Sequence, residues 1–559
     1  MAAPHALTRP AVASYAARRL AQLQAEIRQP VVGRRVPGTV PVAVGSGLVS
    51  LAASAVFLGS GLSLAYGDAL AHLTIARRLF DTLGTPGLGQ LGTVWLPAPH
   101  LLLAPFVVLL GLWQNGWGGA LLGAVCLAAT ASGGYRAAAR LGFHRIGRAA
   151  VVATLVLNPS MLYLHSTALT EPVLIAGMAG CLAGLAHWAT KARRLSPGEI
   201  AVFCGLPAAV AALSRYEGWA LTAAGGLFVA LVSLWRERGA SPAVLRDLFG
   251  FLAVPLTAMA WWVAFNWVTF GEPFGFIFGE YSAGALQAEL VAQGLTSAGD
   301  LQRTVATLNT AVLSTVGAGA LGLAALGLVL GLIAGRRGYR LLFLAMTTVT
   351  YVFMLVSLYT GQAVIFNPVT SDVSFWNNRY GMSCILPVAL AIGLGAQALR
   401  EGISEHRGRL RRLGRAVIPV VIGGILAASA AWQLAAPTER SLVLAEAGQQ
   451  LAGSAGPRAA AAWLGANYDG GRILLDEAVA ANSVLPLPGI PLAEYYLRAT
   501  DVRFAQALAD PAGHARWLWA STHEGDAVTE RLAADPALAA AYRVAYSAEG
   551  VTVYRRAER

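Results

Sequence analysis

Residues 66–100 read YGDALAHLTIARRLFDTLGTPGLGQLGTVWLPAPH, and this stretch directly follows the first long apolar run of the chain. Asp68 stands four positions before His72, so the two side chains share one face of a predicted helix. Two arginines follow, and a Pro-rich segment leads back into apolar sequence. Ionisable groups beside membrane segments are costly and are commonly retained for function. The side of the membrane that this stretch faces therefore decides which other residues can join it.

The composition predicts a polytopic α-helical membrane protein. Of the 559 residues, 56% are hydrophobic and only 13% are charged, whereas a soluble protein carries roughly a quarter charged residues. The net charge of +12 does not indicate a nucleic-acid partner, because the arginines gather in short loops between apolar runs. The four cysteines lie in apolar runs without metal-like spacing, so we expect neither a disulfide framework nor a zinc site.

Twelve apolar runs approach or exceed the length of a membrane span. In chain order they are 41–65, 97–113, 118–139, 148–164, 172–190, 199–214, 218–235, 249–270, 307–334, 340–360, 380–399 and 416–435. Arginines before the first run place the N-terminus in the cytoplasm. If 97–113 crossed the membrane, five later basic clusters would fall outside; if it does not cross, all five are cytoplasmic. We therefore expect 97–113 to be re-entrant or to lie at the interface, which leaves about eleven transmembrane helices and an external C-terminus.

This topology divides the chain into three parts. Residues 1–40 form a cytoplasmic leader, and residues 41–436 form the transmembrane domain, whose first external loop, 66–117, contains juxtamembrane helices. Residues 437–559 are soluble in character and form a small external α/β domain. Its expected strands are 471–479, 515–521 and the hairpin 542–556, and its expected helices are 501–509 and 526–534. Without a nucleophile motif or phosphate loop, this domain is expected to cover or shape the external site.

Four groups of polar residues stand at the external ends of the expected helices. They are Asp68 with His72, His165 with Glu171, Arg215 with Glu217, and Asn378 with Arg379 and Tyr380. Asp68 could serve as a general base, or it could simply be the N-cap of the helix and complement the helix dipole. Arg379 could bind phosphate bidentately or anchor the chain at the interface. Arg215 could grip an anionic headgroup, or it and Glu217 could simply satisfy each other.

The order of several motifs resembles that of the polytopic GT-C glycosyltransferases. These motifs are GDALAH, VWLPAPHLL, RLGFHRIGRAA, LHSTALTEP, SRYEGW and NNRYGMSCILP, within residues 41–435. The closest likeness is to glycosyltransferase family 39, which holds protein O-mannosyltransferases and bacterial enzymes like the aminoarabinose transferases. Protein O-mannosyltransferases usually carry two adjacent acids in the first loop, whereas Ala69 follows Asp68 here. This departure argues against protein mannosylation.

The resemblance implies transfer of a sugar from a polyprenyl-phosphate donor to an acceptor hydroxyl, on the external face of a bacterial inner membrane. In this reading Asp68 is the catalytic base, Glu171 is the second acid, and Arg379 contacts the lipid phosphate. The residues expected to bind or orient substrate are His72, His165, Arg215, Glu217, Asn378, Arg379 and Tyr380. No cofactor is implied with certainty, and a divalent metal ion on Glu171 stays open. The acceptor is a glycan, a lipid or a protein.

Two other classes of function remain as alternatives. A transporter or flippase of lipid-linked sugars would favour charges in the middle of spans and inverted repeats. In this sequence the charges stand at external span ends, and no repeat is evident. A non-catalytic scaffold would fit the soluble C-terminal part but leaves the group of acids unexplained.

Overall fold

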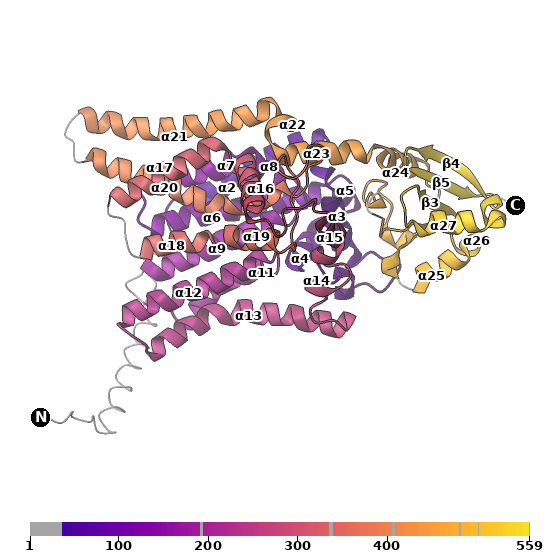
Figure 1. Ribbon diagram of the computed structural model, residues 1–559, viewed down its shortest axis with the longest axis horizontal. Coiled ribbons are helices and arrows are strands. Elements are labelled where there is room, and N and C mark those ends of the chain that lie inside the picture. Colours follow the sequence, from indigo (N-terminus) through magenta and orange to yellow (C-terminus); the bar gives the residue numbers. More distant parts are fainter. Residues whose placement is uncertain are drawn as a thin grey trace, which may run out of the picture.

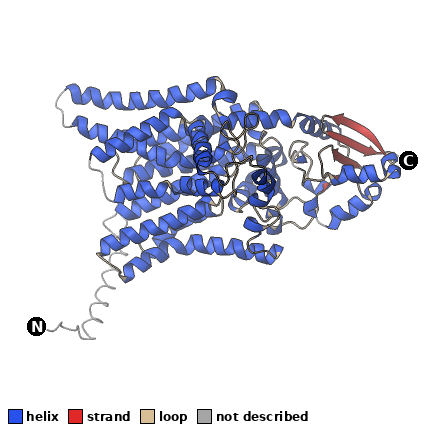
Figure 2. Ribbon diagram, viewed as in Figure 1, coloured by secondary structure: helices blue, strands red, loops and turns tan. Residues whose placement is uncertain are grey.

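The computed structural model describes residues 36–190, 194–334, 339–404, 409–479, 482–500 and 502–557. The chain forms a bundle of long helices with a small α/β region at one end (Figure 1). Figure 2 shows the strands gathered in that region, beside the C-terminus. The expected leader, residues 1–40, lies almost entirely outside the described residues.

Eight helices in the described part of the chain are long and apolar enough to cross a membrane. They are α2 (Thr39–Gly59), α6 (Trp117–Arg140), α9 (Glu171–Thr190), α12 (Glu217–Glu237), α13 (Pro242–Phe270), α18 with α19 (Tyr339–Thr347 and Val349–Tyr359), η5 with α20 (Asn378–Cys384 and Ile385–Ser404), and α21 (Arg409–Ala435). A ninth results if α16 (Leu301–Val316) and α17 (Ala318–Ile333), which meet at 102°, form one broken span. The predicted class is confirmed, with eight or nine such helices where eleven were expected.

Two of the expected spans do not form helices of spanning length. Run 148–164 divides into α7 (Arg145–Val156) and α8 (Pro159–Leu164), because Pro159 cannot donate a backbone hydrogen bond. The side chain of Asn158 then caps α8 by accepting from the Met161 amide at 2.8 Å. Run 199–214 forms one continuous apolar helix, Pro197–Ala212, made of α10 (Pro197–Ile200), a π-helical turn (Ala201–Gly205) and α11 (Leu206–Ala212). This helix, like α7 and α8, is shorter than the roughly 20 residues of a single spanning helix.

Run 97–113 forms three short pieces, α4 (Ala98–Leu103), η3 (Ala104–Val107) and α5 (Leu110–Gln114). None is long enough to cross a membrane as a single helix. Figure 1 places α4 and α5 near α3 (Gly67–Arg78), at the end of the bundle that carries the α/β region. The turn between α12 and α13, which contains Arg238, lies at the opposite end. The arrangement agrees with the expected separation of this basic turn from the 66–100 stretch.

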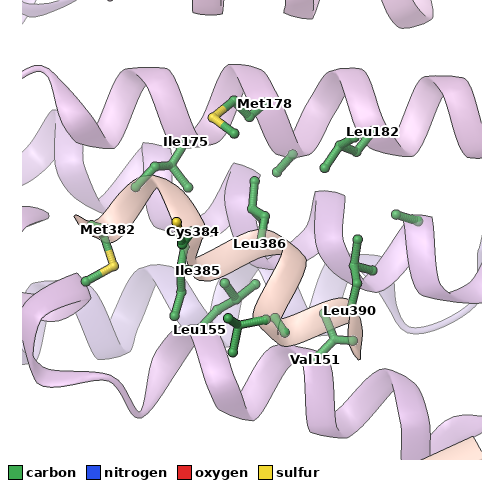
Figure 3. Packing of buried hydrophobic residues seen from close by; sticks show 14 of the residues in the cluster. Val151, Leu155, Ile175, Met178, Leu182, Met382, Cys384, Ile385, Leu386 and Leu390 are labelled. Atoms are coloured by element: carbon green, nitrogen blue, oxygen red, sulfur yellow. The ribbon is translucent and has the colours of Figure 1, made fainter. Parts of the chain in front are cut away.

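Figure 3 shows α20 packed between α7 and α9. The buried side chains that meet there are Val151 and Leu155 of α7, Ile175, Met178 and Leu182 of α9, and Ile385, Leu386 and Leu390 of α20. Glycines permit close approaches of backbone to this layer. At Gly123 in α6, a Cβ atom would lie 1.8 Å from the carbonyl oxygen of His165. This glycine therefore allows the segment that leads into Glu171 to pack directly on α6.

The α/β region contains a five-stranded sheet with strand order β2-β1-β3-β5-β4. The strands are β1 (Ile473–Leu474), β2 (Tyr495–Tyr496), β3 (Trp517–Ser521), β4 (Tyr542–Ala548) and β5 (Val551–Arg556). β1 pairs in parallel with β2 and β3, and β5 runs antiparallel to β3 and β4, with Trp517 opposite Arg555. Alternate residues of β3 enter different cores: Trp517 and Trp519 join one, and Leu518 joins the other.

Most of the elements expected in this region are present. The expected strand at β3, the β4–β5 hairpin, and the helices α25 (Val502–Ala509) and α27 (Ala527–Ala534) are confirmed, whereas the strand expected over 471–479 is only the two residues of β1. The short strand β2 and the helices α23 (Leu442–Gly453) and α24 (Ala455–Asn467) were not foreseen.

The remaining elements of the described chain are short. They are η1 (Leu62–Leu64), η2 (Leu88–Leu91), α14 (Gly275–Phe278), α15 (Ala283–Ala292), α22 (Pro437–Arg440), η7 (Leu492–Glu494), η8 (Arg498–Thr500), α26 (Pro511–His514) and α28 (Pro536–Ala540).

Polar contacts attach the α/β region to the bundle. Asp81, just beyond α3, accepts hydrogen bonds from the amides of Leu492 at 3.2 Å and Ala493 at 2.9 Å. Arg458 of α24 donates to the carbonyl of Leu64 at 2.5 Å. The stretch from Leu64 to Asp81 is thus held from the C-terminal side of the chain.

Candidate active site

A cavity of about 450 Å³ lies among α3, α9, α12, α19 and η5. Its polar lining residues, which we call the polar wall, are Asp68, His72, Glu171, Arg215, Glu217, Arg379 and Tyr380. Its large apolar lining residues, which we call the apolar wall, are Trp219, Phe276, Ile277, Phe353, Met354 and Val356. Seven of the nine site residues predicted from the sequence therefore line one cavity. Its two unlike walls suit a molecule with a charged part and a hydrocarbon part.

Arg379 is the centre of the polar wall. Its Nη2 donates to Oδ2 of Asp68 at 2.5 Å, and its Nε donates to Oε1 of Glu171 at 3.0 Å. Its Nη1 lies 3.5 Å from Oε1 of Glu446, a residue of α23. The side chains of Arg379 and Glu171 are 4% and 5% exposed, whereas that of Asp68 is 39% exposed. Asp68 is thus the carboxylate of this group that is most open to an incoming molecule.

Arg215 forms a second centre beside the first. Its Nε donates to Oε1 of Glu217 at 2.9 Å, and its Nη1 donates to Oε1 of Glu171 at 3.1 Å. The guanidinium also lies over the ring of Tyr380, 4.6 Å from the centroid. Oε1 of Glu171 consequently joins both arginines, while its buried Oε2 makes no hydrogen bond within the described structure. Arg215 and Glu217 form the ion pair that the sequence offered as the alternative to substrate binding. Both residues also line the cavity.

His72 adds an uncharged polar group to the same wall. Its Nδ1 lies 2.9 Å from Nε2 of His100, and its ring centroid lies 4.5 Å from that of Trp95. Burial lowers the pKa of His72 and the positive charges of Arg379 and Arg215 act in the same direction, so that the pKa is about 3. Burial also holds the pKa of His100 well below its usual range. Both imidazoles are therefore neutral near pH 7, and His72 offers the cavity hydrogen bonding without charge.

The start of α3 turns Asp68 towards this wall. The helix begins at Gly67, and its N-cap residue is Tyr66, which makes no side-chain capping bond. Asp68 lies in the first turn, where a negative charge favours the helix dipole. Its carboxylate is nevertheless directed to Arg379, 311 positions later in the chain. The expected capping role of Asp68 is therefore wrong, because Tyr66 is the N-cap residue; only its favourable place relative to the helix dipole remains.

His165 and Asn378, the other two predicted site residues, do not line the cavity. His165 is fully buried, and its Nδ1 lies 2.7 Å from the carbonyl oxygen of Met161. The side chain of Asn378 donates to the carbonyl of Phe366 at 2.7 Å, so this donor is already engaged. Both predictions rested on closeness in sequence to Glu171 or Arg379. Neighbouring residues in a tight turn point in different directions, and proximity along the chain was a poor guide here.

Glu446 is the site residue that the sequence analysis missed. It lies in LVLAEAGQQLAG (442–453), which was assigned to the soluble C-terminal part and given no chemical role. Its side chain is fully buried beside Arg379. Burial raises the pKa of Glu446 to about 7, although Arg379 and the amides of Asn377 and Asn378 act in the opposite direction. A single acid on the apolar side of a helix was the signal that could have identified it.

The carboxylates do not form a ready metal site. Within the described ranges, no cluster of three or more His, Cys, Asp or Glu side chains has the arrangement of metal ligands. Asp68 and Glu171 instead hold a guanidinium between them. The guanidinium groups of Arg379 and Arg215 both engage Oε1 of Glu171, so only its Oε2 would be available to a divalent ion.

Comparisons with known proteins give structural likenesses only. No protein-family profile and no curated protein matches the chain. The crystal structure of ArnT from Cupriavidus metallidurans in the apo state aligns over 97% of both chains, with 14% identity and a TM-score of 0.48. A crystal structure of the Archaeoglobus fulgidus oligosaccharyltransferase tethered with an acceptor peptide aligns over 93% of this chain and 74% of its own, with 12% identity and a TM-score of 0.44. Both proteins are GT-C glycosyltransferases, the class that the sequence motifs resemble.

Proposed function

We propose that the chain is a membrane glycosyltransferase that moves a sugar from a polyprenyl-phosphate donor to an acceptor hydroxyl. The observation that carries this proposal is the meeting of Asp68, Arg379 and Arg215 on one wall of a cavity whose other wall is apolar. A lipid-linked sugar joins a charged phosphate and a polar sugar to a long hydrocarbon. It matches both walls at once, with its hydrocarbon against Trp219 and Phe353.

The proposed reaction uses Asp68 as the general base. Its carboxylate takes the proton of the acceptor hydroxyl, and the acceptor oxygen forms a bond to the anomeric carbon of the donor sugar. The bond between that carbon and the phosphate oxygen breaks, and the phosphate leaves with the bonding electron pair. Attack from the face opposite the leaving phosphate inverts the anomeric centre. General-base catalysis of this kind contributes about 10²–10⁴-fold to a rate.

The arginines supply charge for the leaving phosphate. A guanidinium can donate two parallel hydrogen bonds to phosphate, and fixed positive charge stabilises the negative charge that develops as the bond breaks. Glu171 accepts from both Arg379 and Arg215, so it fixes their relative positions. Glu217 holds the other side of Arg215. Tyr380 lies against both guanidinium groups and lines the same cavity.

The contact between Arg379 and Asp68 links donor binding to the base. In the structure Nη2 of Arg379 donates a hydrogen bond to Oδ2 of Asp68, so this carboxylate oxygen is already engaged. A phosphate that accepts the hydrogen bond from Nη2 of Arg379 would leave Asp68 free to take a proton from the hydroxyl of the sugar acceptor. On this account Asp68 becomes effective as a base only after the lipid-linked sugar has bound. His72, one helical turn away, would orient the hydroxyl through a neutral imidazole.

The cellular setting belongs to the same proposal. We place the cavity on the external face of a bacterial inner membrane, with the N-terminus in the cytoplasm and the α/β region outside. Glycosyl donors carried on polyprenyl phosphate reach that face within the bilayer, so no nucleotide is needed. The acceptor class, whether glycan, lipid or protein, is left open by the side chains of the cavity.

The test uses native membranes, which hold the natural donor and acceptor. The full chain and its Asp68→Asn variant are expressed in a strain that lacks the gene. The polyprenyl-phosphate sugars are then quantified by mass spectrometry. We expect one such lipid to accumulate in the variant and to fall when the wild-type chain is restored. Equal amounts in both strains would contradict the proposal, and movement of the lipid between leaflets without loss of its sugar would support a flippase.

A further inference from the structure

Helix α23 contacts both segments that carry the charged residues of the cavity. On one side, Oε1 of Glu446 accepts from the Asn377 amide at 2.9 Å, and its Oε2 accepts from the Asn378 amide at 3.2 Å. These amides directly precede Arg379, whose Nη1 lies 3.5 Å from the same carboxylate. The backbone at Asn377 is left-handed, with φ of 61°. The carboxylate thus holds a turn of uncommon conformation in place.

The same helix contacts the segment before Asp68. The Gly67 amide donates to Oε1 of Gln450 at 3.1 Å, and the hydroxyl of Tyr66 donates to the carbonyl of Val443 at 3.0 Å. Val443, Glu446 and Gln450 are spaced i, i+3 and i+7, so they lie on one face of α23. One helix face therefore bonds to the chain on both sides of the ion pair between Asp68 and Arg379.

We propose that α23 is a positioning element of the active site, in which Glu446 fixes Arg379 while Val443 and Gln450 fix the start of α3 and thereby Asp68. The proposal extends the α/β side of the chain from a cover over the site to a part of its framework. Its consequence for catalysis rests on the proposed function, whereas the positioning itself does not. Glu446 acts through Arg379 and is not expected to touch substrate.

The charge of Glu446 should also affect how strongly the cavity binds a phosphate-bearing lipid. The groups that face it are Arg379, Asp68, Tyr66 and Tyr163. Because the pKa of Glu446 is raised to about 7, this carboxyl gains its charge as the pH rises through neutrality. The four carboxyls around the cavity then face only two guanidinium groups. A phosphate-bearing lipid should therefore bind more weakly above pH 7 than below it, by about fivefold to tenfold.

Amide hydrogen exchange on the full chain in nanodiscs tests the positioning directly. In Glu446→Ala, we expect the Asn377 and Asn378 amides to exchange at least about tenfold faster, because both lose their acceptor. Glu446→Gln keeps only one acceptor oxygen, so it should restore protection of one amide and not both. Gln450→Ala should affect Gly67. Gln449→Ala is the matched control, because Gln449 accepts from the Phe375 amide at 3.0 Å and should alter that position alone.

Binding of polyprenyl monophosphate to the same nanodiscs, measured from pH 6 to pH 8, tests the consequence. The phosphate itself gains charge in this range, with a second pKa of about 6, and this effect is common to all variants. The affinity of wild type relative to that of Glu446→Gln should therefore fall as the pH rises, and Glu446→Ala should bind worse than Glu446→Gln. Unchanged exchange at Asn377 and Asn378 in both Glu446 variants would overturn the positioning role. If exchange responds as expected but wild type binds no polyprenyl monophosphate, the positioning role stands and the proposed donor class fails. Faster exchange in α6 and α9 of Glu446→Ala would mean that this variant loses structure generally. The positioning role is then judged from the exchange of the Asn377 and Asn378 amides in Glu446→Gln.

Discussion

Nη2 of Arg379 donates a hydrogen bond to Oδ2 of Asp68 at 2.5 Å, although the two residues are 311 positions apart. The bond joins the first turn of α3 to the 3-10 helix η5 that leads into α20. Arg379 is nearly inaccessible, while Asp68 remains open to the cavity. An incoming phosphate could therefore replace Asp68 as the hydrogen-bond partner of Arg379. The proposed function depends on this exchange of partners.

Asp68→Asn should abolish transfer without unfolding the chain. The amide keeps the size of the side chain and a carbonyl acceptor for Arg379, but it cannot take a proton. We expect the transfer rate to fall about 10²–10⁴-fold, with binding of polyprenyl monophosphate unchanged or stronger because Arg379 is less firmly engaged. Asp372→Asn makes the same chemical change at an exposed loop position and should behave as wild type. Full transfer by Asp68→Asn would remove Asp68 as the base.

Arg379→Gln should destabilise the folded chain strongly. The substitution leaves the buried carboxylates of Glu171 and Glu446 without this cation. Removing one partner of a buried ion pair typically costs about 3–5 kcal/mol in the free energy of unfolding. Denaturant titration in detergent measures this loss, with Arg503→Gln on the exposed face of α25 as the control. A change below about 1 kcal/mol would mean that the carboxylates find other partners.

Acid should destabilise the chain through its buried imidazoles. The pKa of His72 is lowered to about 3, far below the ordinary value of 6.5, so the folded state binds fewer protons than the unfolded state. The contribution of His72 is present above pH 6.5 and is lost as the pH falls towards 3. Between pH 6.5 and pH 4.5 the loss amounts to about 2–3 kcal/mol.

The pH dependence has a matched comparison within the chain. His72→Gln should flatten this part of the curve of unfolding free energy against pH, whereas His523→Gln, at an exposed loop, should not. Glu446 contributes with the opposite sign, because its pKa is raised to about 7 and its stabilising share is lost as the pH rises towards that value. Identical slopes for wild type and His72→Gln would show that His72 is not held neutral by the fold.

Gly123→Ala should disturb the packing that leads to Glu171. A Cβ at Gly123 would lie 1.8 Å from the carbonyl oxygen of His165, so the backbone of one segment must shift. Overpacking of this kind typically costs about 1–3 kcal/mol in unfolding free energy, and we expect weaker lipid binding as well. Gly45 of α2 has no atom within 4 Å of an added Cβ, so Gly45→Ala should be neutral or slightly stabilising. Equal stability of both variants would contradict this account of the close approach.

Much of the site could be predicted because its residues stand at those ends of hydrophobic runs that the arginine distribution assigns to one side of a membrane. Membrane helices turn such ends towards one another, so Asp68, Glu171, Arg215 and Arg379 could be grouped before their distances were known. That Arg215 and Arg379 both donate to the same oxygen of Glu171 could not be foreseen, because this contact depends on the rotation and tilt of the helices. Sequence position alone likewise could not separate Arg379, which lines the cavity, from Asn378, which does not.

The errors in the fold have a common physical origin. Hydropathy detected the apolar runs, but it does not report where Pro159 interrupts a helix or where α16 and α17 bend by 102° at Gly317. For this reason the expected number of spans exceeded the eight or nine found among the described residues. Glu446 was missed for a related reason: its helix has the composition of a soluble segment, although its acid is buried against the transmembrane part.

A structure of the full chain in nanodiscs with bound polyprenyl monophosphate tests the central claim most directly. We predict phosphate density within hydrogen-bonding distance of Arg379 or Arg215, hydrocarbon density along Trp219 and Phe353, and loss of the 2.5 Å contact between Arg379 and Asp68. Phosphate bound outside this cavity, with the contact between Arg379 and Asp68 intact, would contradict the account.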